Sequence, residues 1–245
     1  MLLKTPYVMP RSRTRRWRVL LALVVGTVLV APGALAQADQ RKLVTAAAVT
    51  FSSFLSEPKA TWLRQNIGRA RAVMIAPEIT KASIIVGGSA GRAVAVVRDP
   101  QSGLWAGPAF YTLATASIGL QAGVGVSEVV TLVMTEKGVG KLLADSFRMG
   151  GDVAIAMGPL EAGAQSHFVA DLVSFSRGQG VYLGANLDGT VVSTADDWNE
   201  LYYGRRVQVA DILVRRDVQN KQASELLNLI TTAAKNSADV RGGKP

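Results

Sequence analysis

A short glycine-rich motif has the residue types of a hydrolase site. Residues 87–91 read G-G-S-A-G and match G-x-S-x-G, in which a serine nucleophile sits on a sharp strand-to-helix turn. Asp145 or Asp152, followed by His167, would complete a triad in the chain order Ser, Asp, His. Such a triad would hydrolyse esters through an acyl-enzyme, with Ser89 as the nucleophile.

The surroundings of this motif do not fit such a turn. The nucleophile needs a strand before it and a helix after it, whereas residues 92–98 read as another strand. No glycine motif for an oxyanion hole lies upstream of Ser89. We therefore predict that residues 87–91 belong to a hairpin loop and that the protein is not an enzyme. A serine esterase that uses Ser89 stays as an alternative.

Other chemistries lack the residues that they need. The sequence has no cysteine and one histidine, which excludes disulfides, zinc-thiolate sites, thiol catalysis and multi-histidine metal sites. It contains no H-E-x-x-H pair, no calcium-binding loop, no phosphate loop ending in Gly-Lys-Ser/Thr, and no G-x-G-x-x-G that opens a helix. We expect no metal, no cofactor and no nucleotide.

The first 36 residues have the composition of a cleavable secretory signal. Residues 1–18 carry six basic and no acidic residues, and residues 19–30 form an uncharged, mostly aliphatic run. This run is shorter than the roughly 20 residues that span a bilayer. The small residues Ala34 and Ala36 flank Leu35, so we expect cleavage after Ala36 and a periplasmic or secreted protein.

The charge balance argues against nucleic acid as a partner. The whole chain has a formal net charge of +9, but six of its 27 basic residues and none of its 18 acidic residues lie in the predicted signal. The expected mature domain is therefore only mildly basic, at +3, and it has few aromatic residues. Nucleic-acid binding usually needs a strongly basic surface.

Helical periodicity marks both ends of the mature chain. Apolar residues recur at helical spacing over residues 41–55 and 60–74, and again over residues 217–234. We place a single domain at residues 37–235 and a disordered tail at residues 236–245.

Strand periodicity fills the middle of the chain. Residues 82–135 and 152–193 alternate between apolar and polar positions and are broken by turns, with a short helix expected over residues 136–147. Asp188 and Gly189 offer a two-residue hairpin turn. Glycines alternate with apolar residues over residues 119–126, which favours a sharply bent sheet. The predicted fold class is α+β: a mostly antiparallel, strongly coiled sheet or partial barrel, flanked by N- and C-terminal helices.

The two N-terminal helices carry the residues predicted to bind lipid. An amphipathic helix binds a membrane by inserting its apolar face, and each nearby arginine adds about 1 kcal/mol of attraction to anionic lipid. An apolar stripe is also the usual signature of a helix that faces the core, and basic residues often mark solvated helix ends. The predicted lipid-binding residues are Phe51, Phe54, Trp62, Arg64, Arg69 and Arg71.

Short motifs follow one another along the chain: residues 74–77 read M-I-A-P, residues 103–110 read G-L-W-A-G-P-A-F, residues 117–123 read S-I-G-L-Q-A-G and residues 174–181 read S-F-S-R-G-Q-G-V. In this order the motifs resemble the SYLF domain family, a lipid-binding module also described as the yeast actin-binding homology domain. The likeness covers about residues 70–230. The motif residues that we expect to specify the fold are Gly87, Gly88, Trp105, Pro108, Phe110, Gly119, Gln121, Gly123, Gly158, Pro159, Gly180 and Gly189.

The resemblance implies a non-enzymatic domain that binds phospholipid, with phosphoinositides as ligands in eukaryotic members and actin in fungal ones. For an exported protein the transferable part is an anionic phospholipid membrane surface. The chain departs from the family where Ala106 stands in place of a usual serine, and where Glu161 and Ala162 replace a common Gly and Arg. The predicted function is peripheral binding to anionic membrane; the alternative is a scaffold that binds an envelope protein.

Overall fold

The computed structural model describes residues 37–83, 86–118, 123–158, 170–178 and 187–242. The predictions that lie outside these residues concern the signal and the positions Gly119, Gln121, Pro159, Glu161, Ala162, His167 and Gly180. No helix in the described ranges is long and apolar enough to cross a membrane.

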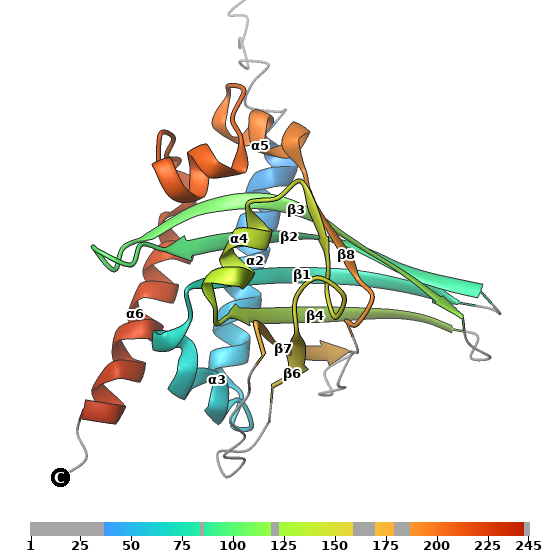
Figure 1. The fold of residues 1–245 in the computed structure, drawn as a ribbon, viewed down its shortest axis with the longest axis horizontal. Coiled ribbons are helices and arrows are strands. Elements are labelled where there is room, and N and C mark those ends of the chain that lie inside the picture. The colour runs from blue at the N-terminus through green and yellow to red at the C-terminus, as the bar shows by residue number, and fades with distance from the viewer. Residues whose placement is uncertain (1–36, 84–85, 119–122, 159–169, 179–186, 243–245) are drawn as a thin grey trace, which may run out of the picture.

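One eight-stranded sheet forms the centre of the domain, in the order β5-β8-β3-β2-β1-β4-β7-β6 (Figure 1). All neighbouring pairs of these strands are antiparallel except β6 and β7. The strands curve strongly, which confirms the predicted fold class. Their bounds are β1 Ala72–Ser83, β2 Val86–Arg98, β3 Trp105–Ile118, β4 Gly123–Val133, β5 Ser146–Arg148, β6 Ile155–Met157, β7 Leu172–Gly178 and β8 Val191–Thr194.

Three helices cover one face of the sheet. Helix α2 (Ala38–Ser56) crosses the strands, α6 (Ser224–Gly242) lies beside it, and α3 (Thr61–Asn66) follows it in the chain (Figure 1). Phe51 and Phe54 of α2 are fully buried in the cluster between these helices and the sheet. The apolar stripe of α2 therefore faces the core, as amphipathic helices of globular domains usually do.

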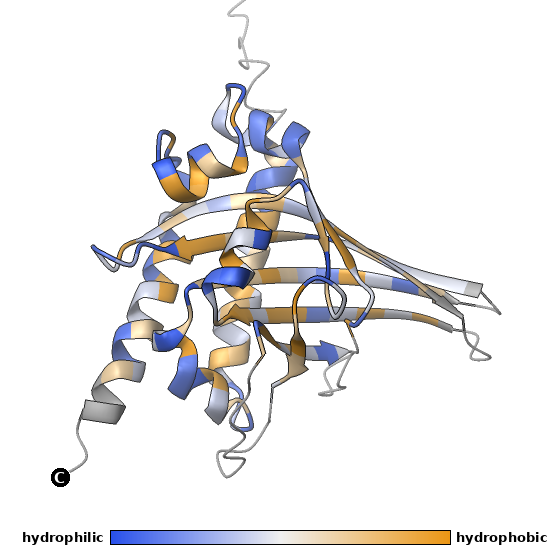
Figure 2. Ribbon diagram, in the orientation of Figure 1, coloured by the Kyte–Doolittle hydropathy of each residue, from blue (hydrophilic) through white to orange (hydrophobic). Residues whose placement is uncertain are grey.

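Other elements cover the opposite face of the sheet, near the end of the long strands over which α2 lies on the first face. Alternate residues of β1 show this arrangement, because Val73 belongs to the cluster under α2 whereas Met74 belongs to a second cluster behind the sheet. Helix α4 (Glu136–Leu142) and the π-helical turn η2 (Asp211–Arg215) border that second cluster. Figure 2 shows the hydrophobic residues concentrated in this part of the sheet.

The second predicted helix is shorter than expected. The prediction ran from 60 to 74, whereas α3 ends at Asn66, a 3₁₀ turn η1 (Ile67–Arg69) follows, and β1 already begins at Ala72. The residues after η1 alternate between the two faces of the sheet, which is a period of two. The apolar run Ala72, Val73 and Met74 is too short for the sequence to distinguish a strand period of two from a helical period.

The predicted disorder after residue 235 is wrong as far as residue 242, because α6 continues to Gly242. Ser237, only 3% exposed, donates a hydrogen bond to the carbonyl of Gln65 (2.9 Å) and accepts one from the amide of Gly68 (3.2 Å). A polar residue in the predicted tail thus fastens the helix end to η1.

A helix that the sequence analysis did not predict, α5 (Asp196–Tyr203), follows β8. Its Asn199 is fully buried, and the side-chain oxygen accepts a hydrogen bond from the amide of Phe110 in β3 (2.9 Å). The nearby hydroxyl of Tyr203 donates to the carbonyl of Pro108 (2.9 Å). This helix therefore stabilises the start of β3, where the register with β2 shifts.

Several motif residues have defined places in the structure. Trp105 and Phe110 are buried in the core under the helices. Gly189 adopts a φ of 80° in the turn before β8, a conformation that glycine adopts without a steric cost. A β-carbon on Gly158 would lie 2.2 Å from the ring of Phe175, so only a residue without a side chain fits there.

Candidate functional site

A cleft of about 780 Å³ opens at the end of the sheet where β1 begins and β2 ends. It is bordered by the first turns after α2, by the β2–β3 turn and by the end of β4. Its lining residues are Trp62, Asn66, Arg69, Ala70, Arg71, Arg98, Asp99, Pro100, Gly103, Met134, Thr135, Ala170, Asp171 and Val173.

Backbone pairing places two of the arginines side by side. The amide of Arg71 donates to the carbonyl of Val133 (2.8 Å), and the amide of Arg98 donates to the carbonyl of Arg71 (2.7 Å). Arg71 precedes β1 and Arg98 ends β2, so the antiparallel pairing of these strands brings both to one edge of the cleft. Arg69, at the end of η1, is exposed beside them.

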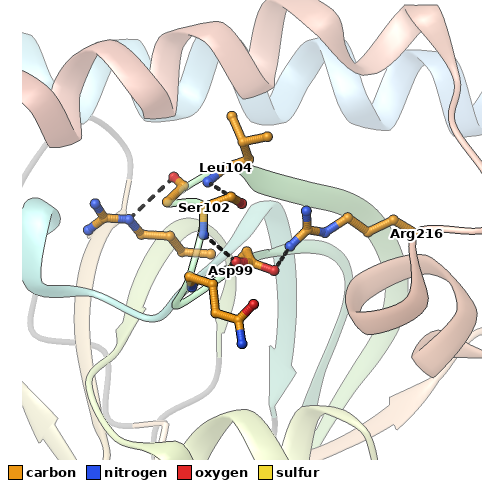
Figure 3. A network of polar contacts seen from close by, with 7 residues as sticks. Asp99, Ser102, Leu104 and Arg216 are labelled. Carbon is orange, nitrogen blue, oxygen red and sulfur yellow. Dashed lines mark hydrogen bonds and ion pairs between the residues drawn. The ribbon is translucent and has the colours of Figure 1, made fainter.

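A network of polar contacts shapes the β2–β3 turn at the rim of the cleft (Figure 3). The carboxylate of Asp99 accepts hydrogen bonds from the amides of Gln101 (2.8 Å) and Ser102 (2.6 Å) and contacts the guanidinium of Arg216. The amide of Leu104 donates to the hydroxyl of Ser102 (3.3 Å). Local bonds of this kind fix a turn without help from other elements.

The cleft carries an excess of positive charge. Its two acids already have cationic partners, because Asp99 pairs with Arg216 and Asp171 lies 3.3 Å from the amine of Lys137. Arg71 contacts Glu136 at the start of α4, and both side chains are well exposed. Arg69 and Arg98 form no ion pair with another described residue. The lining residues and their partners comprise five cations and three carboxylates.

The environment of Asp171 keeps its carboxylate ionised. Burial raises the pKa of this carboxyl, but hydrogen bonds from the hydroxyl of Thr135 (2.6 Å), the amide of Ala154 (3.0 Å) and the amine of Lys137 outweigh that effect. The pKa of Asp171 therefore lies below its usual value. The same carboxylate joins the strand ends to the start of α4.

Three of the six predicted lipid-binding residues meet at the cleft. Trp62, Arg69 and Arg71 all line it. The Trp62 ring lies 5.9 Å from the ring of Phe175, centre to centre. Arg64 lies elsewhere: its guanidinium donates to the carbonyls of Leu55, Glu57 and Pro58 and so caps the end of α2.

The prediction that Phe51 and Phe54 dock into a membrane is wrong for this structure. Both side chains have no exposed surface, and the guanidinium of Arg177 lies over the Phe54 ring, 5.2 Å from its centre. Helical periodicity alone does not tell whether an apolar stripe faces the core or a membrane.

The sequence analysis missed Arg98. Its guanidinium donates to the carbonyl of Gly68 (2.9 Å), which holds it against η1 at the back of the cleft. A signal was available, because an arginine before one strand and an arginine after the next strand become neighbours when the two strands form a hairpin.

Ser89 lies within β2 and not in a loop, opposite Lys81 of β1 and Thr115 of β3. The strand continues for nine residues beyond it to Arg98, so the helix that a nucleophile elbow requires does not follow. The structure gives the esterase alternative no support at the serine. The arginine cleft offers guanidinium donors and an aromatic wall, which suit binding of an anion.

Comparison with known proteins points to one family. Residues 114–233 match the family model Ysc84, described as a Las17-binding protein actin regulator. LAS seventeen-binding protein 3 of Saccharomyces cerevisiae is 26% identical over 174 residues, which is 68% of this chain and 38% of that protein. SH3 domain-containing YSC84-like protein 1 of Homo sapiens is 23% identical over 169 residues, or 67% and 49%. The chain thus spans less than half the length of these relatives.

Proposed function

Because the chain belongs to the Ysc84 family, which is also the SYLF family, we propose that it is an exported, non-enzymatic domain that binds anionic phospholipid at a membrane surface. The observation that carries the proposal is the cleft in which Trp62, Arg69 and Arg71 meet Arg98. Guanidinium groups bind phosphate through parallel N–H···O hydrogen bonds, and their charge favours anionic over zwitterionic lipid.

The cleft replaces the apolar face of α2 as the proposed membrane contact. Arg69 is exposed, and among the described residues the guanidinium of Arg71 is engaged only by the exposed carboxylate of Glu136. A phosphate oxygen therefore reaches both guanidinium groups at little desolvation cost. Trp62 supplies an amphipathic ring, a side chain that often lies at the level of lipid headgroups.

The test is co-sedimentation of residues 37–245, which include every described element, with vesicles of phosphatidylcholine alone or mixed with phosphatidylglycerol. We expect binding to the anionic vesicles at 50 mM salt and loss of most of it at 500 mM, because salt screens such contacts. Replacing Arg69 and Arg71 together by Ala removes two charges and weakens binding about thirtyfold, at about 1 kcal/mol per charge.

The matched control is Arg206→Ala, which removes one equally positive and 94% exposed side chain outside the cleft. This variant retains wild-type binding if the cleft is the site. If the control loses as much binding free energy per removed charge as the cleft variant does, net charge alone drives binding. Absence of binding to either vesicle would overturn the proposed function.

The alternative is an envelope scaffold that binds another protein. The name of the yeast relative, LAS seventeen-binding protein 3, states that that protein binds a protein partner. A cleft that bound no vesicle, together with capture of one stoichiometric partner that is lost in the Arg69 and Arg71 double variant, would favour this function.

A further inference from the structure

The outer halves of the four long strands extend beyond the helices as a projecting sheet (Figure 1). We define the projecting sheet as residues 79–83, 86–91, 112–118 and 123–127, at the ends of β1 to β4 that lie away from the arginine cleft. Helix α2 covers the inner halves of the same strands and leaves these outer halves without a helical layer.

The two faces of the projecting sheet differ in chemistry. Its pairing registers place Ala90 beside Ala114 and place Ala82 beside Val124 on the side of α2. The opposite face carries Ser89 and Thr115, and the hydroxyl of Thr115 lies 2.7 Å from that of Thr190. The side toward α2, which we call the aliphatic face, presents Ala82, Ala90, Ala114, Ala116, Val124 and Val126, and Thr80 and Thr112 lie at its inner border.

The aliphatic face is the more exposed of the two. Val124 is 75% exposed and Val126 is 43% exposed, and the four alanines of the face are all exposed. Within the described part of the projecting sheet, Lys81 is the one charged residue, and it lies on the hydroxyl face. In Figure 2 these strand ends are mostly pale to orange. Exposed strands are normally protected by charges, and a continuous exposed apolar patch marks an interaction surface.

A lipid bilayer does not fit this surface. The face lies on the same side as α2, and a helix packed on a sheet rises about 10 Å above it, so a flat membrane would meet the polar outer side of α2 first. That side carries Asp39 and Lys42, whose side chains are 72% and 79% exposed. The pairing of β4 with β7 ends at Ser127, and the pairing of β3 with β8 ends at Ala114. Among the described strands, the edges beyond them keep backbone groups that hydrocarbon would leave without hydrogen bonds.

A second sheet fits this surface. Two packed sheets lie about 10 Å apart, and α2 rises about 10 Å above its sheet, so a second sheet can lie beside α2 without meeting it first. Four strands about 4.8 Å apart and about six residues long give a face of about 380 Å². A standard stable interface buries about 800 Å² on each partner, so this face alone supports a weak, reversible complex. Beyond Glu78, which is exposed at the inner border of the aliphatic face, the described part of this face has no charge to oppose an identical face. Two-fold pairing is the commonest symmetry of protein oligomers.

We propose that two copies of the chain pack their aliphatic faces against each other as a reversible two-fold dimer. The small side chains let the two sheets approach closely, and the edges stay in water, which hydrates their backbone groups. The arginine cleft of each copy lies at the other end of the strands and stays open.

The experiment is sedimentation equilibrium of residues 37–245 from 1 to 200 μM, in the wild type, Val124→Lys and Val214→Lys. Val214 is the matched control, because it is a 53% exposed valine on η2, which packs behind the other face of the sheet. We expect a wild-type dimer that dissociates within this range, at least a tenfold higher dissociation constant for Val124→Lys, and no change for Val214→Lys.

Circular dichroism of each variant verifies that it is folded, so loss of the dimer is not loss of structure. A wild type that stays monomeric at 200 μM overturns the proposal, as does a dimer that Val124→Lys leaves intact. Binding of neutral phosphatidylcholine vesicles that depends on Val124 would identify a bilayer as the occupant and would also overturn it. None of these results depends on whether the arginine cleft binds anionic lipid.

Discussion

The guanidinium of Arg216 contacts the carboxylate of Asp99, although 117 positions separate the two residues in the chain. Both side chains are largely covered, at 29% and 24% exposure. The same carboxylate accepts two amide hydrogen bonds within the β2–β3 turn. A single side chain thus joins the segment after η2 to the turn that borders the arginine cleft.

Replacement of Asp99 separates these two roles. Asp99→Asn keeps an oxygen for the turn amides but leaves Arg216 without its counter-charge, and we expect a loss of about 1 kcal/mol in the free energy of unfolding. Asp99→Ala removes both roles and costs about 2–3 kcal/mol. Urea unfolding of both variants measures the difference. Glu200→Gln is the control, because its contact with Arg206 is long (3.6 Å) and exposed; it changes the unfolding free energy by less than about 0.5 kcal/mol.

Asn199 of α5, like Asp99, uses one side chain to hold a segment that is distant in the sequence, here the backbone of Phe110 in β3. Its amide group meets both the amide (2.9 Å) and the carbonyl (3.4 Å) of Phe110, with no exposed surface. Asn199→Ala leaves a buried strand amide without an acceptor and costs about 2–3 kcal/mol. Asn199→Asp keeps the acceptor but buries a charge, so it is at least as destabilising at neutral pH. Thermal unfolding of the two variants checks this order; an Ala variant as stable as the wild type would contradict it.

Gly158 tests the packing of β7 against the segment after β6. An added methyl group would lie 2.2 Å from the ring of Phe175, so Gly158→Ala forces the ring to move and costs about 1–3 kcal/mol. A double variant that also carries Phe175→Leu removes the clashing ring atoms. We expect the Ala substitution to cost less in the Leu background, and a double-mutant cycle by urea unfolding measures the coupling.

The carboxyl of Asp171 makes stability fall in acid. Its pKa is lower in the folded protein than in the unfolded chain, so the folded state gains stability above the unfolded pKa of about 3.9 and loses it as the pH falls through the lower folded value. Asp171→Asn removes this contribution, and its unfolding free energy should change less between pH 5 and pH 2.5 than that of the wild type. Lys137→Met removes one of the groups that lower the pKa and flattens the profile in part. Parallel profiles for all three proteins would contradict the assignment.

The features that were predictable from the sequence are those with local or repetitive signals. The alternation over residues 82–135 indicated strands, the Asp188–Gly189 pair indicated a turn, and Trp105 and Phe110 had the character of core residues. The coiled α+β fold follows from such patterns together with the order of the family motifs.

The remaining features depend on which distant segments meet. Whether Phe51 faces the core or solvent is decided by what α2 packs against, and its periodicity is the same in either case. The place of Arg98 in the cleft depends on the register between β1 and β2, which shifts between Ile75 and Glu78. A one-residue error in that register would move every side chain to the other face.

The hydroxyl of Ser237 joins the last helix to the N-terminal part of the domain, because it forms hydrogen bonds with the backbone of Gln65 and Gly68, about 170 positions earlier. During synthesis, the residues of α2 emerge long before the α6 residues that lie against them. Contacts of such long sequence separation make folding slow, because much of the chain has to be ordered before they form. The domain therefore completes its fold only after the residues of α6 have emerged from the ribosome, and until then the apolar stripe of α2 is open to chaperones.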